Sequence, residues 1–290
     1  MRTFRLSFVV VFAAIFFTVN AANMPRPEYP RPQFERSEWT NLNGTWTYIF
    51  DFGNSGAEQG YEKSTGFGSK IIVPFCPESS LSGIGHKDFI NTMWYQRTLH
   101  IPQSWTGKHV MLNFGGVDYR STIYINGHRV QEHFGGSASF AVDIAPYVNF
   151  GADNNLVVQV QDDVRSRVQG AGKQSDRLHS YSCFYTRVTG IWQTVWLEPI
   201  AKGGLKACRI TPDLDNKQFV FEPGYKLEVK VKEGTKTVFR QEVTAANSSI
   251  VAAKMSKVKT WSPESPFLYD IELTVKNERG ADADCVKAYA

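Results

Sequence analysis

Apolar and polar residues alternate over most of this chain. The alternation is clear in residues 110–114, 156–161, 227–232 and 269–276, where every second side chain is aliphatic or aromatic. A period of two places one set of side chains in a core and the other in solvent, as in a β-strand. Asn126-Gly127, between two apolar runs, adds a two-residue hairpin turn. No long amphipathic helical pattern interrupts these segments, so the chain is predicted to be all-β and to form β-sandwiches.

Residues 185–198 are the most specific stretch of the sequence. Trp192, Thr194 and Trp196 fall on one face of an extended chain, and the intervening residues, mostly aliphatic, fall on the other. This pattern predicts a strand buried on both faces or nearly so. Gly190 precedes the strand, where a bulge or a close backbone approach is expected. Two tryptophans on one face indicate core packing, with ligand stacking as the alternative.

The composition of the chain changes between Pro199 and Lys206, just after this strand. The chain before Pro199 is rich in aromatic residues, whereas the strands after Lys206 are shorter, rich in lysine and poor in aromatic residues. Gly203-Gly204 makes a hinge between the two parts. We therefore place a domain boundary at Lys202, with a jelly-roll sandwich over residues 22–202 and an immunoglobulin-like sandwich over residues 203–290.

The first 21 residues have the pattern of a secretory signal peptide. Arg2 and Arg5 precede an apolar run from Leu6 to Val19, and small residues follow at a cleavage position. The run is short for a membrane-spanning helix, and no cysteine follows it as in a bacterial lipoprotein. We therefore expect a periplasmic or secreted protein with no membrane anchor after cleavage.

Charge and cysteine content exclude several classes of function. The net charge is +4, and basic residues are interleaved with acidic ones, so nucleic acid is not an expected partner. The four cysteines do not make a disulfide scaffold. A bond between Cys208 and Cys285 is one interpretation, and four free thiols are the other. The sequence carries no metal-ligating cluster and no nucleotide-binding fingerprint, so we expect neither a metal nor a cofactor.

Several segments resemble glycoside hydrolase family 2, in the order that the family has them. They are LNGTWTYIFD at 42–51, MWYQRTLHIP at 93–102, VDYRSTIYINGHRVQEHFGGSASFAVDI at 117–144, NNLVVQVQD after it, TRVTGIWQTVWLEP at 186–199 and WSPESPFLYDIELTV at 261–275. The resemblance implies an N-terminal sugar-binding jelly roll followed by an immunoglobulin-like domain. The loop ESSLSGIGHKDF favours the β-galactosidase-like members.

The resemblance also implies what this chain lacks. Members of the family continue into an (α/β)-barrel that carries two catalytic glutamates, and a retaining mechanism places these carboxyl groups about 5 Å apart. This sequence ends at Ala290, near the last strand of the second sandwich. We therefore expect no catalytic residue and no glycosidase activity in these residues alone. The expected partners are a carbohydrate and the barrel domain, whose sugar pocket this chain would scaffold and complete.

The start of the 185–198 stretch contains candidate sugar contacts. The resemblance places an acidic sugar-binding residue of some family members at Phe184, with Tyr185 next to it. A phenyl ring cannot accept a hydrogen bond, so this position departs from the family. Phe184 and Tyr185 are candidates to stack on a sugar, and packing in the core is the alternative. Arg187 is a candidate to bind a sugar hydroxyl or, alternatively, to form a structural ion pair.

Residues 79–91 form the second candidate contribution to a sugar pocket. Two glycines allow unusual backbone angles, and His86, Asp88 and Asn91 supply polar groups. A solvated surface loop is the alternative for each of them. His128 and His133 are not expected to share a metal, because residues five apart on a strand point to opposite faces.

Two other functions remain open from the sequence. The chain is alternatively a carbohydrate-binding module that acts alone, which requires exposed aromatic side chains, or a structural or adhesive protein with no sugar site. A scaffold for a barrel instead requires an exposed apolar surface, and this surface predicts self-association of the isolated chain.

Overall fold

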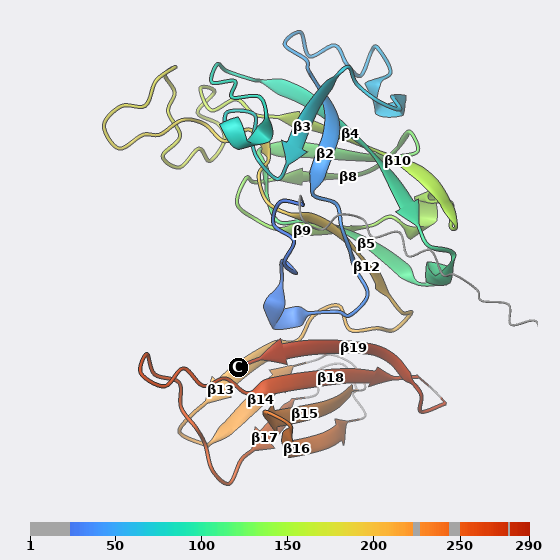
Figure 1. Cartoon of the computed structure of the whole chain (residues 1–290), viewed down its shortest axis with the longest axis vertical. Coiled ribbons are helices and arrows are strands. Elements are labelled where there is room, and N and C mark those ends of the chain that lie inside the picture. Colours follow the sequence, from blue (N-terminus) through green and yellow to red (C-terminus); the bar gives the residue numbers. More distant parts are fainter. Residues whose placement is uncertain (1–23, 223–226, 244–249, 278) are drawn as a thin grey trace, which may run out of the picture.

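The computed structural model describes residues 24–222, 227–243, 250–277 and 279–290. The signal peptide predicted for residues 1–21 lies outside the described residues. The described chain forms two stacked β-sandwiches, which confirms the all-β prediction (Figure 1). Its described helices are short 3-10 turns: η2 (Pro32–Phe34), η3 (Tyr61–Lys63), η4 (Ser80–Ser82), η5 (Gln103–Trp105) and η6 (Ala145–Tyr147). Within the described ranges, none has the length and hydropathy needed to span a membrane.

The first sandwich consists of two antiparallel sheets. One has the order β3-β2-β4-β10-β7-β8, with bounds Ser69–Val73, Gly44–Phe50, Thr92–Ile101, Ala152–Gln161, Arg120–Ile125 and His128–Phe134. The other has the order β1-β12-β5-β9, with bounds Thr40–Asn41, Val195–Ile200, His109–Phe114 and Phe140–Asp143. A two-stranded ladder of β11 (Gly190–Ile191) and β6 (Val117–Asp118) closes one end. The core between the sheets contains Trp46, Tyr95 and Phe114, which are fully buried.

The second sandwich is smaller and has fewer aromatic residues in its core. Its sheets have the orders β13-β14-β17 (Arg209–Asp213, Gln218–Glu222, Val251–Lys254) and β16-β15-β18-β19 (Lys236–Val243, Leu227–Glu233, Asp270–Lys276, Asp282–Tyr289). Leu227, Val229 and Val231 of β15 are buried as the alternation predicted, but Glu228 on the other face is buried as well. Cys208 and Cys285 are not bonded to each other and all four cysteines are free, so the suggested disulfide was wrong.

The N-terminal segment joins the two sandwiches. Phe34 packs in the core of the second sandwich, and Glu35 exchanges two backbone hydrogen bonds with Lys287 of β19. The next side chain, Arg36, lies between Glu198 of the first sandwich and Asp284 of the second, at 2.9 and 3.0 Å. A residue far before the predicted boundary therefore contributes to the second core. The boundary at Lys202 itself stays a prediction.

The 185–198 stretch is interrupted rather than continuous. β11 ends at Ile191 and β12 begins at Val195, and the residues between them leave the sheet. Trp196 is buried, as core packing predicts, whereas Trp192 is only half-buried. Gly190 has φ +79°, and a Cβ there would lie 2.1 Å from the Tyr95 hydroxyl. Glycine is thus required at the point where the strand approaches the core.

Candidate functional site

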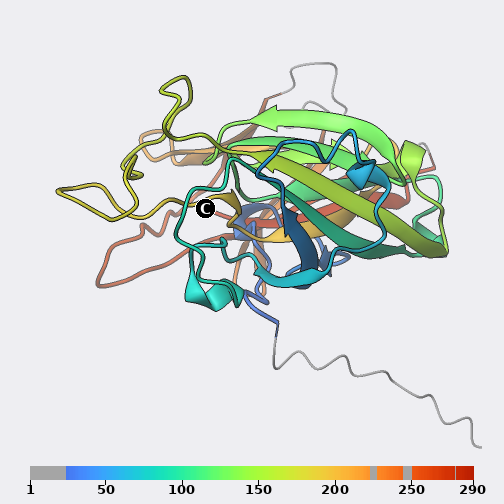
Figure 2. The same cartoon turned by 90° about the horizontal axis from the view of Figure 1, so that it is seen from above.

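Three loops meet at one end of the first sandwich. They are residues 74–91 between β3 and β4, residues 135–139 between β8 and β9, and residues 162–189 between β10 and β11. Figure 2 shows the last of these extending well beyond the sheets. Side chains hold the loops to one another and to the sandwich, because Trp192 Nε1 donates to Gly136 O at 2.7 Å and Gln174 Nε2 donates to Asp118 Oδ2 at 2.7 Å.

Arg187 fixes the long loop from within. The side chain is buried, and its guanidinium donates to the carbonyl oxygens of Ser175 at 3.1 Å, Arg177 at 2.6 Å and Lys87. It also lies over the Phe89 ring, 4.2 Å from the centroid. Burial lowers the pKa of the guanidinium, although nearby carboxylates act in the opposite direction. Arg187 therefore binds backbone carbonyls in the structure, and not the carboxylate partner that the ion-pair alternative required.

Three acidic side chains are buried beneath these loops. Glu78, Asp118 and Asp162 are each about nineteen-twentieths removed from solvent. Thr189 links two of them, because its amide donates to Glu78 at 3.2 Å and its hydroxyl donates to Asp162 at 3.0 Å. One oxygen of Glu78 and one of Asp118 have no hydrogen-bond partner among the described residues. Such groups are uncommon in folded proteins, since burying a charge without a partner is costly.

Burial shifts the acidity of all three groups in the same direction. It raises the pKa of Glu78 and of Asp162 above their ordinary values. For Asp118, burial and the neighbouring charges of Asp162 and Glu78 raise the pKa to about 7, despite the hydrogen bond from Gln174. Asp118 is therefore a much weaker acid than a surface aspartate.

Not all of the residues predicted from loop 79–91 lie at this site. His86 is half-buried against Phe50, with ring centroids 5.0 Å apart, and its Nε2 has no hydrogen-bond partner among the described residues. Asp88 is exposed and accepts from the amide of Phe89 at 2.7 Å. Asn91 is exposed too, and its backbone carbonyl accepts from Asp162. Their predicted role as sugar contacts stays a prediction.

Phe184 and Tyr185 lie on the far loop and differ in exposure. Phe184 is half-buried and stacks on Tyr181 with centroids 5.1 Å apart, whereas Tyr185 is 50% exposed. Tyr185 lines a cavity of about 200 Å³ together with Asp118 and Trp192. Gly136, Gly170 and Gly172 form much of the remaining wall. The structure thus brings Tyr185 to a carboxylate that the sequence analysis did not select.

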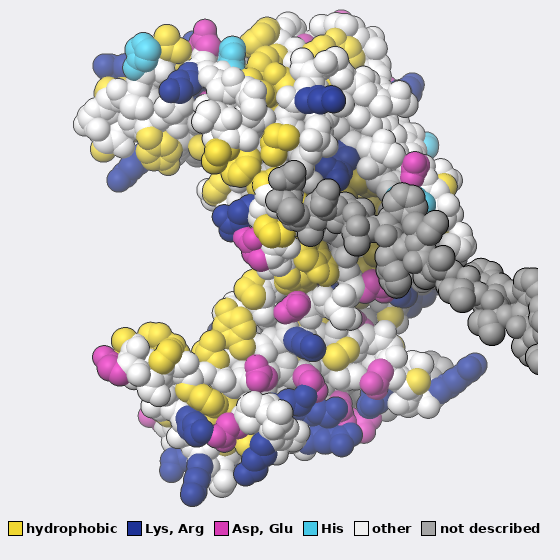
Figure 3. Space-filling model, in the orientation of Figure 1, with side chains coloured by type: hydrophobic (Ala, Val, Ile, Leu, Met, Phe, Trp, Pro, Cys, Tyr) yellow, Lys and Arg dark blue, Asp and Glu magenta, His cyan; other side chains and the backbone are white. Residues whose placement is uncertain are grey.

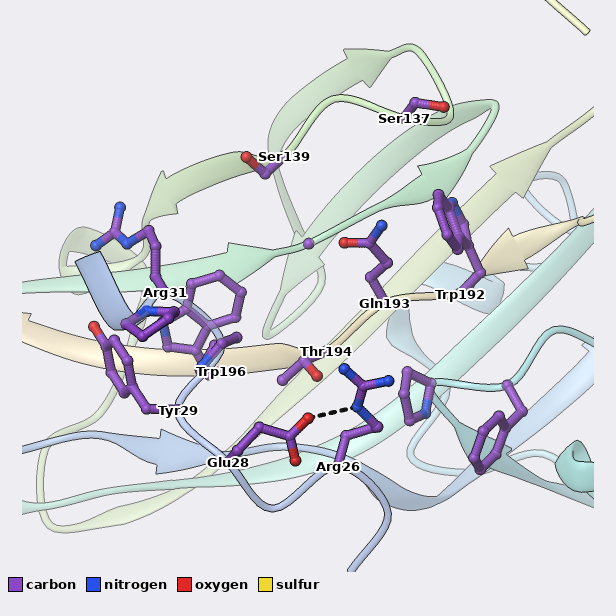
Figure 4. Close-up of a pocket in the computed structure, with 15 residues that line it drawn as sticks. Arg26, Glu28, Tyr29, Arg31, Ser137, Ser139, Trp192, Gln193, Thr194 and Trp196 are labelled. Carbon is purple, nitrogen blue, oxygen red and sulfur yellow. Dashed lines mark hydrogen bonds and ion pairs between the residues drawn. The ribbon is translucent and has the colours of Figure 1, made fainter. Parts of the chain in front are cut away.

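A larger groove of about 760 Å³ adjoins this cavity along the start of β12. Figure 4 shows Gln193 and Thr194 between Trp192 and Trp196 along the groove, with Ser137 above. Trp196 is almost fully buried, whereas Trp192 is half-buried, so Trp192 is the tryptophan whose ring is accessible in the groove. A groove with one aromatic face and several hydroxyl and amide groups is typical of polar ligand sites.

The second sandwich also exposes apolar side chains. Leu214, Trp261 and Leu268 are about half-exposed or more, and they line a cavity of about 280 Å³ at the edge of that domain. Figure 3 shows hydrophobic side chains along the walls of a concave face between the two sandwiches. Within the described ranges, no cluster of His, Cys, Asp or Glu side chains could hold a metal ion.

Comparison with protein families identifies both sandwiches. The model "Glycosyl hydrolases family 2, sugar binding domain" matches residues 85–198, and the model "Glycosyl hydrolases family 2" matches residues 193–289. The two matches follow each other in chain order and together cover most of the described residues. The chain belongs to glycoside hydrolase family 2. This confirms the resemblance seen in the sequence.

Named family 2 relatives are longer than this chain. A β-glucuronidase of Paenibacillus borealis is 22% identical over 88% of the chain, which covers 45% of that protein. A β-galactosidase of Thermoanaerobacter pseudethanolicus is 25% identical over 82% of the chain, which covers 33% of it. The apo structure of a β-glucuronidase from Ruminococcus gnavus superposes with a TM-score of 0.71 and 19% identity, over 90% of this chain and 46% of that one. The chain thus spans half or less of the relatives it matches.

The family 2 resemblance directed attention to surface loops and missed the buried acids. Glu78, Asp118 and Asp162 come from three separate segments, so no local spacing connects them. One signal was present in the sequence, namely glycines at positions 116, 136 and 190, close to the residues that pack around the site. A Cβ on Gly136 would lie 2.3 Å from the Asp118 carboxyl group. Close approach by a glycine backbone is therefore the local mark of this carboxylate.

Proposed function

We propose that this chain is the non-catalytic N-terminal part of an exported family 2 glycosidase, β-galactosidase-like, and that it supports and completes the sugar pocket of a catalytic barrel. The observation that carries the proposal is the ordered match of both sandwiches to the family, over less than half the length of a family β-glucuronidase. Hydrolysis in such an enzyme requires two carboxyl groups on either side of the glycosidic bond. The proposal assigns that pair to the barrel.

Two surfaces support a scaffolding role. The concave face between the sandwiches has apolar walls, and the second sandwich exposes Trp261 at 57%. Exposed apolar surface of this kind marks a protein interface. The proposal predicts that the isolated chain associates with itself through this surface. Static light scattering at rising concentration should show a rising mean mass, and a constant monomer mass would count against an exposed interface.

The decisive experiment begins with the coding DNA after the codon for Ala290. The proposal expects the frame to continue into βα repeats with two glutamates. Protein from the complete frame should then hydrolyse p-nitrophenyl β-D-galactoside, with the β-D-glucuronide as comparison substrate, and the 290-residue chain should hydrolyse neither. Hydrolysis by the 290 residues alone, or a stop codon after Ala290, contradicts the proposal. N-terminal sequencing of the exported product, expected to begin at Ala22, tests the signal peptide separately.

A carbohydrate-binding module that acts alone is the second candidate. It is favoured by the exposed Tyr185 ring and by the groove that Trp192, Ser137 and Gln193 line. Aromatic faces bordered by hydroxyl and amide groups suit a sugar ring. A glycan array distinguishes the two candidates, because only the module predicts retention of glycans by the chain without a barrel. Replacement of Trp192 by alanine should abolish that retention.

A further inference from the structure

The cavity beside Trp192 has an unusual charge. Asp118 is 6% exposed, lines the cavity and has one carboxyl oxygen without a hydrogen-bond partner among the described residues. Its other oxygen is bound by a neutral amide, that of Gln174. No described Lys, Arg or His side chain forms an ion pair with it. A buried carboxylate is ordinarily paired with a cation or neutralised by a proton.

The charged groups around Asp118 are negative and not positive. The charged groups that shift its pKa are Asp162 and Glu78, and both are carboxylates. The buried cation Arg187 donates its hydrogen bonds to backbone carbonyls elsewhere. When these acids are ionised, the cavity therefore carries negative charge, which attracts a cation more strongly than it attracts a neutral molecule.

The walls of the cavity suit an organic cation better than a bare metal ion. The Trp192 indole and the Tyr185 ring both line it, and aromatic faces attract ammonium groups within about 6 Å of the ring centre. No group of metal-ligating side chains was found among the described residues. Glycines 136, 170 and 172 also line the cavity and add no side chains to it, and its volume of about 200 Å³ suits one small ring or short chain.

We propose that the Asp118 cavity binds the protonated amine of a small organic ligand, or of one unit of a larger one. The ammonium group would donate a hydrogen bond to the Asp118 carboxyl group, and its carbon skeleton would lie between Trp192 and Tyr185. This inference does not depend on the proposed glycosidase, because every group that it uses belongs to the described chain.

The test compares two probes of nearly equal shape, cyclohexylamine and cyclohexanol. Binding to the whole chain is followed by the ¹H–¹⁵N resonance of the Trp192 indole, assigned with Trp192→Phe. The amine should shift this resonance at millimolar concentration, and the alcohol should bind about tenfold more weakly, since it lacks the charge-assisted hydrogen bond. Equal binding of the two probes, or no binding of the amine at those concentrations, overturns the proposal.

Two variants and two controls assign the site. Asp118→Asn keeps the size of the side chain and removes its charge, and should weaken amine binding about tenfold, whereas Asp153→Asn, at an exposed carboxylate, should change nothing. If Asp118→Asn does not fold, Tyr185→Ala on the exposed rim provides the same test against Tyr147→Ala, on another surface of the domain. Unchanged affinity in Asp118→Asn, or in Tyr185→Ala where the first variant fails to fold, refutes the assignment.

A pH series adds a readout that a purely structural role would not change. Because ionised Asp118 is the form that binds a cation, amine affinity should rise between about pH 6 and about pH 8, across the pKa of about 7. In Asp118→Asn this rise should disappear. A rise of the same size in that variant would show that another group controls binding, and would contradict the proposed site.

Discussion

Two regions of the first sandwich each bury a carboxylate, and they treat it in opposite ways. Glu198, at the junction between the sandwiches, is fully buried and accepts hydrogen bonds from Tyr29 at 2.7 Å and from Arg36 at 2.9 Å. Asp118, at the loop end, is almost as buried but has a single neutral donor, Gln174. The two carboxyl groups are buried to a similar extent, but only Glu198 has a cationic partner.

The buried charges at the junction between the sandwiches are paired with each other. Arg36 bridges Glu198 to Asp284 and also donates to the carbonyl of Leu205, so one guanidinium connects the N-terminal segment to both sandwiches. Burial acts to lower the pKa of Arg36, but Asp284 and Glu198 outweigh it and raise the pKa overall. Trp196 adds a further donor to Glu198. With its charges matched, Glu198 at this junction serves to hold the N-terminal segment and the two sandwiches together.

The comparison shows how to separate structural from functional burial of charge. A buried acid with its own cation maintains the fold, whereas a buried acid without one keeps an unsatisfied atom that a proton or a ligand can fill. The variant with the largest expected effect is Arg36→Met, because it leaves Glu198 and Asp284 buried without their cation. We expect the free energy of unfolding to fall by about 3–5 kcal/mol, as measured by urea denaturation followed by tryptophan fluorescence.

A matched control for this variant is Arg31→Met. Arg31 contacts the same carboxylate at 3.3 Å, but its side chain is 41% exposed, so its removal should cost about 1 kcal/mol or less. Equal losses in the two variants would show that the number of cations around Glu198 matters and that their burial does not.

Asp118→Asn should raise the free energy of unfolding instead of lowering it, and the gain should depend on pH. The pKa of Asp118 is raised from 3.8 to about 7 in the fold, so the wild-type chain loses stability as pH rises between these values and stays at the lower level above them. Asparagine is neutral throughout. We expect the variant to match wild type near pH 4 and to be more stable by about 2–4 kcal/mol near pH 8.

The measurement is a series of urea denaturation curves across that pH range. Glu78 and Asp162 are present in both proteins, so the difference between the two series reports the ionisation of Asp118 together with its coupling to these two acids. A variant that is less stable than wild type at pH 8 would mean that the ionised carboxylate is stabilised by a partner, and the contrast with Glu198 would fail.

Trp196→Phe tests a single donor at the junction. The ring packing is largely kept, but Glu198 loses the indole N–H that now binds it. We expect a loss of about 1.5–3 kcal/mol in the free energy of unfolding, the range for a hydrogen bond to a charged group. Trp192→Phe is the matched control, because its indole donates to the neutral carbonyl of Gly136 and should cost less.

Asp153→Asn is the variant with the smallest expected change in the free energy of unfolding. Asp153 pairs with His100 at 3.0 Å, but both side chains are at least 65% exposed. Exposed pairs contribute little, so the change in unfolding free energy should be within about 0.5 kcal/mol. A larger loss would show that charge pairing stabilises this protein even in solvent, and would weaken burial as the explanation for the other variants.

The sequence by itself determined the fold class and the family. Alternation in β5, β10, β15 and β18 is a local property, because a period of two specifies a half-buried strand wherever it occurs. The family 2 motifs lie within single segments in the same way, so the order of the domains could be predicted. The interruption at Trp192 could not, since it depends on Gly116 and Gly136 from other loops.

Only the tertiary structure decided which polar groups share an environment. Glu78, Asp118 and Asp162 come from segments that lie far apart in the chain. Arg36 contacts Glu198 and Asp284, which are separated from it by more than half of the sequence. Charge burial depends on all the groups around an atom, which no local pattern encodes. The sequence thus specified the strands and the family, and folding specified which acids are paired and which are left without a cation.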